Sequence, residues 1–179
     1  MRRVSILALL VAGLSAALAL ASCGGKEPGG TEGGEGEPIV LGSLSYNVGI
    51  SRFLNPDDTE DHAYLTGQPP APSGSEYFGV FIQILNDSDQ PQASASDYTV
   101  VDTLHNEYKP IPSDSPYALD IGAELPGDGQ VPVVDTTAQT GPNEGSLILF
   151  RVNDDVSDNR PLLLEIGTGS ETGEITLDI

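Results

Sequence analysis

The stretches YFGVFIQIL at residues 77–85 and SLILFRV at residues 146–152 are apolar at nearly every position. Runs of this length, rich in aromatic and branched side chains, are typical of β-strands that are covered on both faces. Asn, Asp, Gly and Pro cluster after the first run at 86–91 and before the second at 141–145, and these residues favour chain reversal. The two runs therefore predict central strands, with one face on a core and the other partly covered.

Three further segments alternate apolar and polar residues with the two-residue period of a half-buried strand. Their apolar members are Leu44, Tyr46, Val48 and Ile50, then Leu162, Leu164 and Ile166, and finally Ile175, Leu177 and Ile179. The segments 97–104 and 106–111 flank a short turn and predict a hairpin. Nothing after residue 38 shows the three-and-four spacing of a helix, so the pattern predicts an all-β sandwich or barrel.

The first 22 residues have the layout of a secretory signal peptide, with Arg2 and Arg3 ahead of an apolar run over 4–21. A transmembrane helix is the alternative, because 18 residues span roughly 27 Å as a helix. The residues Leu20-Ala21-Ser22-Cys23 decide between them, since they resemble the lipobox of bacterial lipoproteins. In that class the cysteine receives a diacylglycerol and the leader is cut before it. We therefore predict a signal peptide over 1–22 and lipidation of Cys23.

Cys23 is the only cysteine, so the chain forms no internal disulfide, and lipidation accounts for this lone thiol. Two or three acyl chains, at roughly 0.8 kcal/mol per buried CH₂, would hold the protein stably on a bilayer. The predicted location is extracytoplasmic, on the cell membrane or the outer membrane. Residues 24–38 contain seven glycines and four glutamates, which predicts a disordered tether ahead of one domain over 39–179.

The chain is strongly acidic, with a formal charge of −20. Loss of residues 1–22 would remove two arginines and make this −22. Nucleic-acid binding requires basic side chains that displace counterions from phosphate, so we expect no nucleic-acid partner. The same charge argues against a second, electrostatic attachment to anionic lipid. The simplest role for the charge is solubility.

Four segments resemble a known family: FGVFIQILNDSDQP (78–91), DYTVVDTLHNEYKP (97–110), EGSLILFRVNDD (144–155) and PLLLEI (161–166). Together they are similar to the telokin-like, immunoglobulin-like domain of bacterial lipoproteins. That domain has no known function and is related in fold to an immunoprotective extracellular protein of mycobacteria. The resemblance covers about 41–179 and implies an antiparallel immunoglobulin-like β-sandwich without catalytic residues.

The chain departs from that family in two places. His105-Asn106 stands where the family usually has a glycine turn, although Asn tolerates the left-handed conformation that such a turn needs. Residues 112–143 are expanded, which leaves their strand order open.

The residue inventory predicts that the protein is not an enzyme. His62 and His105 are the only histidines, both in polar contexts, and no G-x-S-x-G motif is present. Two histidines without a free cysteine do not make a usual zinc or copper site, so we expect no metal site and no cofactor. The leading hypothesis is a non-enzymatic binding or accessory module of the cell envelope, with a protein or glycan partner.

Calcium provides the alternative hypothesis. The segment 55–61 places Asn55, Asp57, Thr59 and Asp61 on alternate residues, and 86–89 and 153–159 are also acidic. Ca²⁺ prefers such oxygen ligands, although Glu60 stands where an EF-hand needs glycine. A Ca²⁺-stabilised structural module of the envelope is therefore the rival to a binding module, while solvated turns are the simpler interpretation. The Pro- and Gly-rich segment 67–76 is an exposed loop, the kind of segment that often carries binding.

Overall fold

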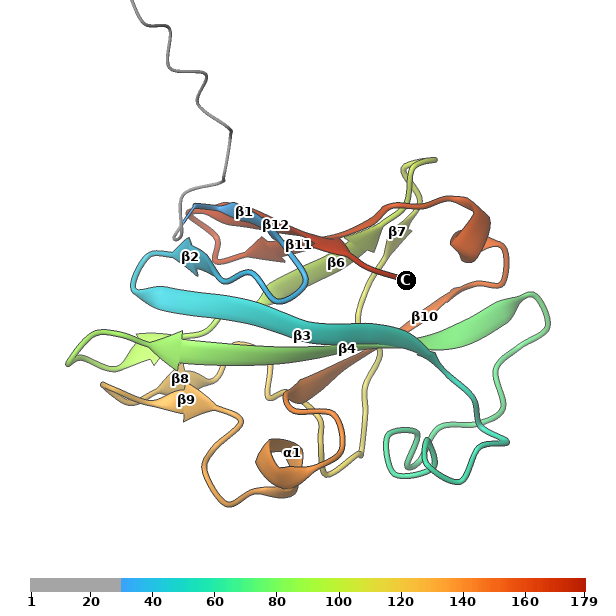
Figure 1. The fold of residues 1–179 in the computed structure, drawn as a ribbon, viewed down its shortest axis with the longest axis horizontal. Helices are drawn as coiled ribbons and strands as arrows, with labels where there is room; N and C mark the ends of the chain where they lie inside the picture. Colours follow the sequence, from blue (N-terminus) through green and yellow to red (C-terminus); the bar gives the residue numbers. More distant parts are fainter. Residues whose placement is uncertain (1–29) are drawn as a thin grey trace, which may run out of the picture.

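The computed structural model describes residues 30–179 (Figure 1). The predicted signal peptide over 1–22, the lipidation of Cys23 and the tether over 24–29 lie outside these residues. Within 30–179 no helix is long and apolar enough to cross a membrane.

Two five-stranded sheets face each other and form a β-sandwich, which confirms the predicted all-β fold class (Figure 1). The first sheet has the order β1 (Glu32–Gly34), β12 (Thr172–Leu177), β11 (Leu162–Gly167), β6 (Asp97–Val101) and β7 (Glu107–Tyr108). The second has the order β10 (Ser146–Asn153), β4 (Ser75–Asn86), β3 (Leu44–Leu54) and β2 (Ile39–Leu41), with β9 (Gln130–Val131) also on β4. Strands β5 (Gln92–Ala93) and β8 (Glu124–Leu125) form a separate ladder, and the helical turns are α1 (Thr137–Thr140) and η1 (Val156–Asp158).

The main core lies between the two sheets. The predicted alternation is confirmed in β11, where Leu162, Leu164 and Ile166 are all fully buried. It is also confirmed in β12, where Ile175 and Leu177 are buried. Each such side chain stabilises the fold by roughly 1.5–3 kcal/mol on burial, so the facing apolar rows account for much of the association between the sheets.

A second core covers the outer face of β4 and β10. Tyr77 and Phe81 of β4 point to this side, together with Leu147 and Leu149 of β10. The segments 55–74 and 111–143 supply its cover, with these buried members: Tyr64, Leu65, Tyr117 and Ala138. The central-strand prediction for 77–85 and 146–152 is thus confirmed, and the outer face is partly covered as predicted, since Leu85 at the end of β4 is 46% exposed.

The alternation in β3 breaks at a β-bulge. Leu44, Tyr46 and Val48 are buried in the main core, as predicted. The pairing of β3 with β4 then shifts register between Val48 and Ile50. A bulge inserts one extra residue and reverses the side on which the following side chains lie. The prediction that Ile50 shares the face of Val48 is therefore wrong, because Ile50 packs against the second core.

The sandwich begins earlier than predicted. The sequence predicts a disordered tether over 24–38, but β1 lies within this segment and pairs in parallel with β12. Glycine permits this close packing: a Cβ on Gly173 would lie 2.6 Å from Ile39 Cδ1, and one on Gly33 would lie 3.0 Å from Ile39 Cγ2. The domain therefore includes residues 30–38, and only 24–29 can belong to a tether.

The predicted hairpin around residue 105 is present as β6 and β7. His105 has φ 64°, so histidine rather than Asn106 occupies the left-handed position. The buried carboxylate of Asp102 organises the turn. It accepts hydrogen bonds from the backbone N–H groups of Leu104 and Asn106, both at 2.9 Å, and from the Tyr108 hydroxyl at 3.2 Å.

The pKa of Asp102 predicts an acid-dependent contribution to stability. Burial by itself would raise this pKa, but the hydrogen bonds from Asn106, Leu104 and Tyr108 outweigh burial and lower it. The contribution is therefore complete above the unfolded pKa of about 3.9 and is lost as the pH falls through the folded value. At pH 7 we expect Asp102→Asn to lower the free energy of unfolding by about 2 kcal/mol relative to wild type. Urea unfolding should show this gap closing below about pH 4, and a gap independent of pH would contradict the assignment.

Candidate functional site

The sandwich has two ends of different character (Figure 1). At the tether end, β1 begins beside the β2–β3 turn at Gly42 and the β11–β12 turn at 168–171. The opposite, distal end carries the segments 55–74, 102–106 and 153–161. Backbone hydrogen bonds join these distal segments, from Asp154 N–H to the Gly74 carbonyl at 3.2 Å and from Thr103 N–H to the Asn159 carbonyl at 3.0 Å.

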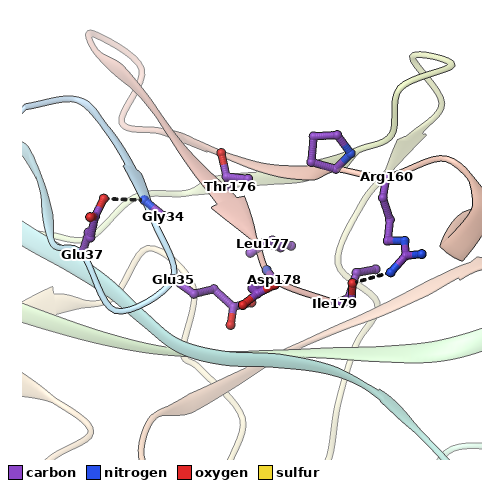
Figure 2. Close-up of a pocket in the computed structure, with 9 residues that line it drawn as sticks. Gly34, Glu35, Glu37, Arg160, Thr176, Leu177, Asp178 and Ile179 are labelled. Atoms are coloured by element: carbon purple, nitrogen blue, oxygen red, sulfur yellow. Dashed lines mark hydrogen bonds between the residues drawn. The ribbon is translucent and has the colours of Figure 1, made fainter. Parts of the chain in front are cut away.

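One groove, of about 690 Å³, lies between the β1–β2 connection and the end of β12 (Figure 2). Several of its polar groups are engaged within the protein. A Glu35 carboxylate oxygen accepts hydrogen bonds from the Ser51 hydroxyl and from Asp178 N–H, the latter at 3.1 Å. Arg160 donates to the Ile179 carbonyl at 2.8 Å. The Glu35 carboxylate thus links β3 of one sheet to the end of β12 of the other, and we call these two hydrogen bonds the Glu35 clasp.

A second groove, of about 620 Å³, lies at the distal end between the β3–β4 connection and the start of β4. Leu54 and Tyr77 are its buried members, and Phe53 is partly exposed. The other lining residues are Asn55, Pro56, Asp57, Pro70, Ala71, Ser75 and Glu76. The lining therefore combines apolar side chains with polar ones, and two carboxylates are among its exposed members. We call this surface the distal groove.

Most polar groups of the distal groove already have partners. The Asn55 side-chain oxygen accepts a hydrogen bond from Asp57 N–H at 2.9 Å. The hydroxyls of Ser75 and Tyr77 donate to carbonyls of the adjacent proline-rich loop, at 2.8 and 2.6 Å. The carboxylates of Asp57 and Glu76 make no hydrogen bond or ion pair within residues 30–179. The groove therefore offers a ligand two carboxylate acceptors and, within residues 30–179, one side-chain donor without a partner, the amide NH2 group of Asn55.

A buried ion pair fixes one wall of the distal groove. Asp61 is 2% exposed and binds the Arg52 guanidinium with both carboxylate oxygens. It also accepts a hydrogen bond from Asn55 N–H at 2.7 Å, which ties the start of the loop to its middle. The Arg52 guanidinium in turn lies 5.9 Å from the centre of the Tyr64 ring. Residues 55–64 are thus anchored to the second core.

The acidic segments singled out in the sequence do not converge. In 55–61, Asp61 faces Arg52, whereas Asn55 and Asp58 accept hydrogen bonds from backbone N–H groups of the same loop. In 86–89, Asn86 turns inward and donates to the Gln90 carbonyl at 2.8 Å. Within the described chain, no group of three or more His, Cys, Asp or Glu side chains is placed to hold a metal ion. The calcium alternative remains a hypothesis that these contacts do not test.

The two histidines lie apart. His62 is exposed in the loop 55–66 and its Nε2 lies 2.9 Å from the Pro56 carbonyl oxygen. His105 is exposed at the tip of the β6–β7 turn. The residues that sequence reasoning missed are Phe53 and Glu76. They come together because β3 and β4 pair with Phe53 opposite Phe78, which places Glu76 near the end of β3. The sequence does not show this register, because a long loop separates the two strands.

No protein-family model matches the chain, and neither does any curated protein. Solved structures do share the fold. The YjhA protein of Bacillus subtilis is 11% identical, with a TM-score of 0.53 over 81% of this chain and 99% of its own. A conserved hypothetical protein of Bacillus anthracis is 11% identical, with a TM-score of 0.50 over 80% of this chain and 94% of its own. At such identities the likeness establishes a common β-sandwich fold and nothing about activity.

A further solved structure is a candidate lipoprotein of Bacillus subtilis, YcdA. It is 12% identical, with a TM-score of 0.45 over 78% of this chain and 38% of its own.

Proposed function

We propose that this protein is a lipid-anchored, extracytoplasmic module of the cell envelope that binds a partner without catalysing a reaction. The lipobox-like Leu20-Ala21-Ser22-Cys23 supports the anchor. The observation that carries the binding role is the separation of the two ends, because β1 leaves the sandwich opposite the distal groove (Figure 1). The proposal includes kinship with the telokin-like, immunoglobulin-like lipoprotein domains, on the segments 78–91 and 97–110.

The short connection to the anchor supports a defined orientation. Seven residue steps separate Cys23 from Gly30, and a fully extended chain of that length reaches at most about 25 Å. The tether end would therefore stay near the lipid headgroups and the distal groove would face away. The tether end also carries Asp128 and Glu171, which anionic headgroups repel within a Debye length of about 8–10 Å.

The anchor is tested at the cysteine. We expect wild-type protein to be recovered from membranes as a chain that begins at Cys23 and carries acyl groups. Cys23→Ser removes the sulfur that is acylated, so the chain should keep residues 1–22 and its labelling by a fatty acid should fall to background. Intact-mass spectrometry of both purified proteins measures this.

Gly25→Ser is the matched control, since it introduces the same side chain two residues beyond the motif. It should be processed and acylated like wild type. A wild-type product with its leader intact, or with an unmodified thiol, would refute the anchor and leave the sandwich fold untouched.

A further inference from the structure

We propose that the distal groove binds a basic peptide segment of an envelope protein. Asp57 and Glu76 would receive lysine or arginine head groups, while the methylene stems and neighbouring apolar side chains lie along Phe53, Pro56 and Pro70. This inference rests on the proposed role as a binding module and adds to it the class of partner.

The unpaired carboxylates of the groove favour a ligand that carries hydrogen-bond donors. Its two hydroxyl groups donate hydrogen bonds within the protein, and the carboxylates of Asp57 and Glu76 are the charged groups of the lining that are left unpaired. A ligand that pairs with these carboxylates must bring hydrogen-bond donors, and charged donors form the stronger bonds to carboxylates. Lysine and arginine also have apolar stems that pack on apolar surface while their charged heads reach polar groups. One kind of side chain thus matches both parts of the lining.

The charge around the groove favours the same partner. The loop residues 55–76 contain five carboxylates and no lysine or arginine, and 153–161 adds three carboxylates and one arginine. That arginine, Arg160, donates to the Ile179 carbonyl, and Arg52 is paired with Asp61. The distal loops are therefore net negative, which steers a basic partner toward them and speeds its association.

The walls of the groove are already fixed. Tyr77 is 1% exposed and its hydroxyl holds the proline-rich loop, while Asp61 holds Asn55 N–H on the opposite side. The prolines at 56 and 70 further restrict the backbone on both sides. A preformed groove loses little conformational entropy when it is filled, so even a small number of contacts gives measurable affinity.

The competing ligands fit less well. A glycan would present hydroxyls that need both donors and acceptors, and the Asn55 amide is the one side-chain donor of the groove without a partner within residues 30–179. A divalent cation needs more ligands than two carboxylates, and no cluster of three such groups exists within residues 30–179. Calcium is therefore included as a competitor in the test.

The test measures binding of a fluorescent twelve-residue peptide of alternating lysine and leucine to the full mature protein in nanodiscs of neutral lipid. The salt concentration is kept at 150 mM, so that long-range charge effects are screened beyond about 8 Å. We expect Asp57→Asn combined with Glu76→Gln to raise the dissociation constant about tenfold, which corresponds to roughly 1.4 kcal/mol. The pair Asp128→Asn and Glu171→Gln removes the same charge at the tether end and should change it less than twofold.

Two further peptides separate recognition from general attraction to an acidic protein. A lysine–glycine peptide keeps the charge and loses the apolar side chains, whereas a glutamine–leucine peptide keeps the apolar side chains and loses the charge. Each should bind about tenfold more weakly than the lysine–leucine peptide. Equal losses from the two double variants, or equal binding of the lysine–leucine and lysine–glycine peptides, would overturn the proposal. Competition by calcium at millimolar concentration would also overturn it, in favour of a cation site. These outcomes are independent of the acylation of Cys23, so the two proposals can fail separately.

Discussion

Arg52→Met is expected to lower the free energy of unfolding by about 3 kcal/mol at pH 7, because it leaves the carboxylate of Asp61 buried without its cation. Asp61 is 2% exposed, whereas the Arg52 side chain is 33% exposed. Water can partly replace the guanidinium, so the expected loss lies at the lower end of the range for broken buried pairs. Guanidinium chloride unfolding, followed by circular dichroism, measures the loss.

The double variant Arg52→Met, Asp61→Asn is the matched control. The amide oxygen of asparagine can still accept the hydrogen bond from Asn55 N–H, and no charge remains buried. We expect this variant to recover about 2 kcal/mol relative to Arg52→Met alone. If both variants unfold within about 0.5 kcal/mol of wild type, the pair is a solvated surface contact and does not fix the loop.

Much of the sandwich was predictable, because strands with one buried face alternate in polarity and strands with two buried faces are apolar throughout. The period-two pattern identified β11 and β12, and the apolar runs identified β4 and β10. The bulge at Gly49 was not predictable, because it depends on how β3 pairs with a strand beyond a twenty-residue loop. Ile50 therefore points to the opposite core from the one that its spacing indicated.

β1 escaped prediction for a different reason. Its sequence, Glu32-Gly33-Gly34, has the composition of a flexible linker and no apolar side chain. It is ordered through main-chain pairing with β12 and through the Glu35 clasp, whose partners Ser51 and Asp178 lie far along the chain. Composition alone does not reveal a strand whose order depends on main-chain pairing with a distant segment.

The candidate site was predictable only as a set of loops. The exposed segment 67–76 and the acidic segment 55–61 were recognised separately, and each forms one side of the distal groove. Their meeting depends on the β3–β4 hairpin, which sets Leu54 opposite Tyr77. The ion pair between Asp61 and Arg52 is likewise a tertiary contact that the sequence does not reveal. Asp61 was therefore predicted only as a candidate calcium ligand.

Phe81→Ala is expected to lower the free energy of unfolding by about 4 kcal/mol, because it opens a cavity in the second core. Phe81 is fully buried, and its ring meets that of Tyr64 at 5.0 Å with an interplanar angle of 76°. Leu85→Ala is the control on the same face of β4, since Leu85 is 46% exposed and should lose less than about 1 kcal/mol. Urea unfolding measures both losses.

Because Phe81 supports Tyr64, its loss should also loosen the loops that form the distal groove. Hydrogen exchange within 55–74 should become faster in Phe81→Ala, while exchange in β11 and β12 changes only with global stability. A loss below about 1.5 kcal/mol, or exchange in 55–74 that follows the rest of the chain, would show that the outer face of β4 is merely covered. The two cores would then be energetically separate, and the main core alone would hold the sandwich together.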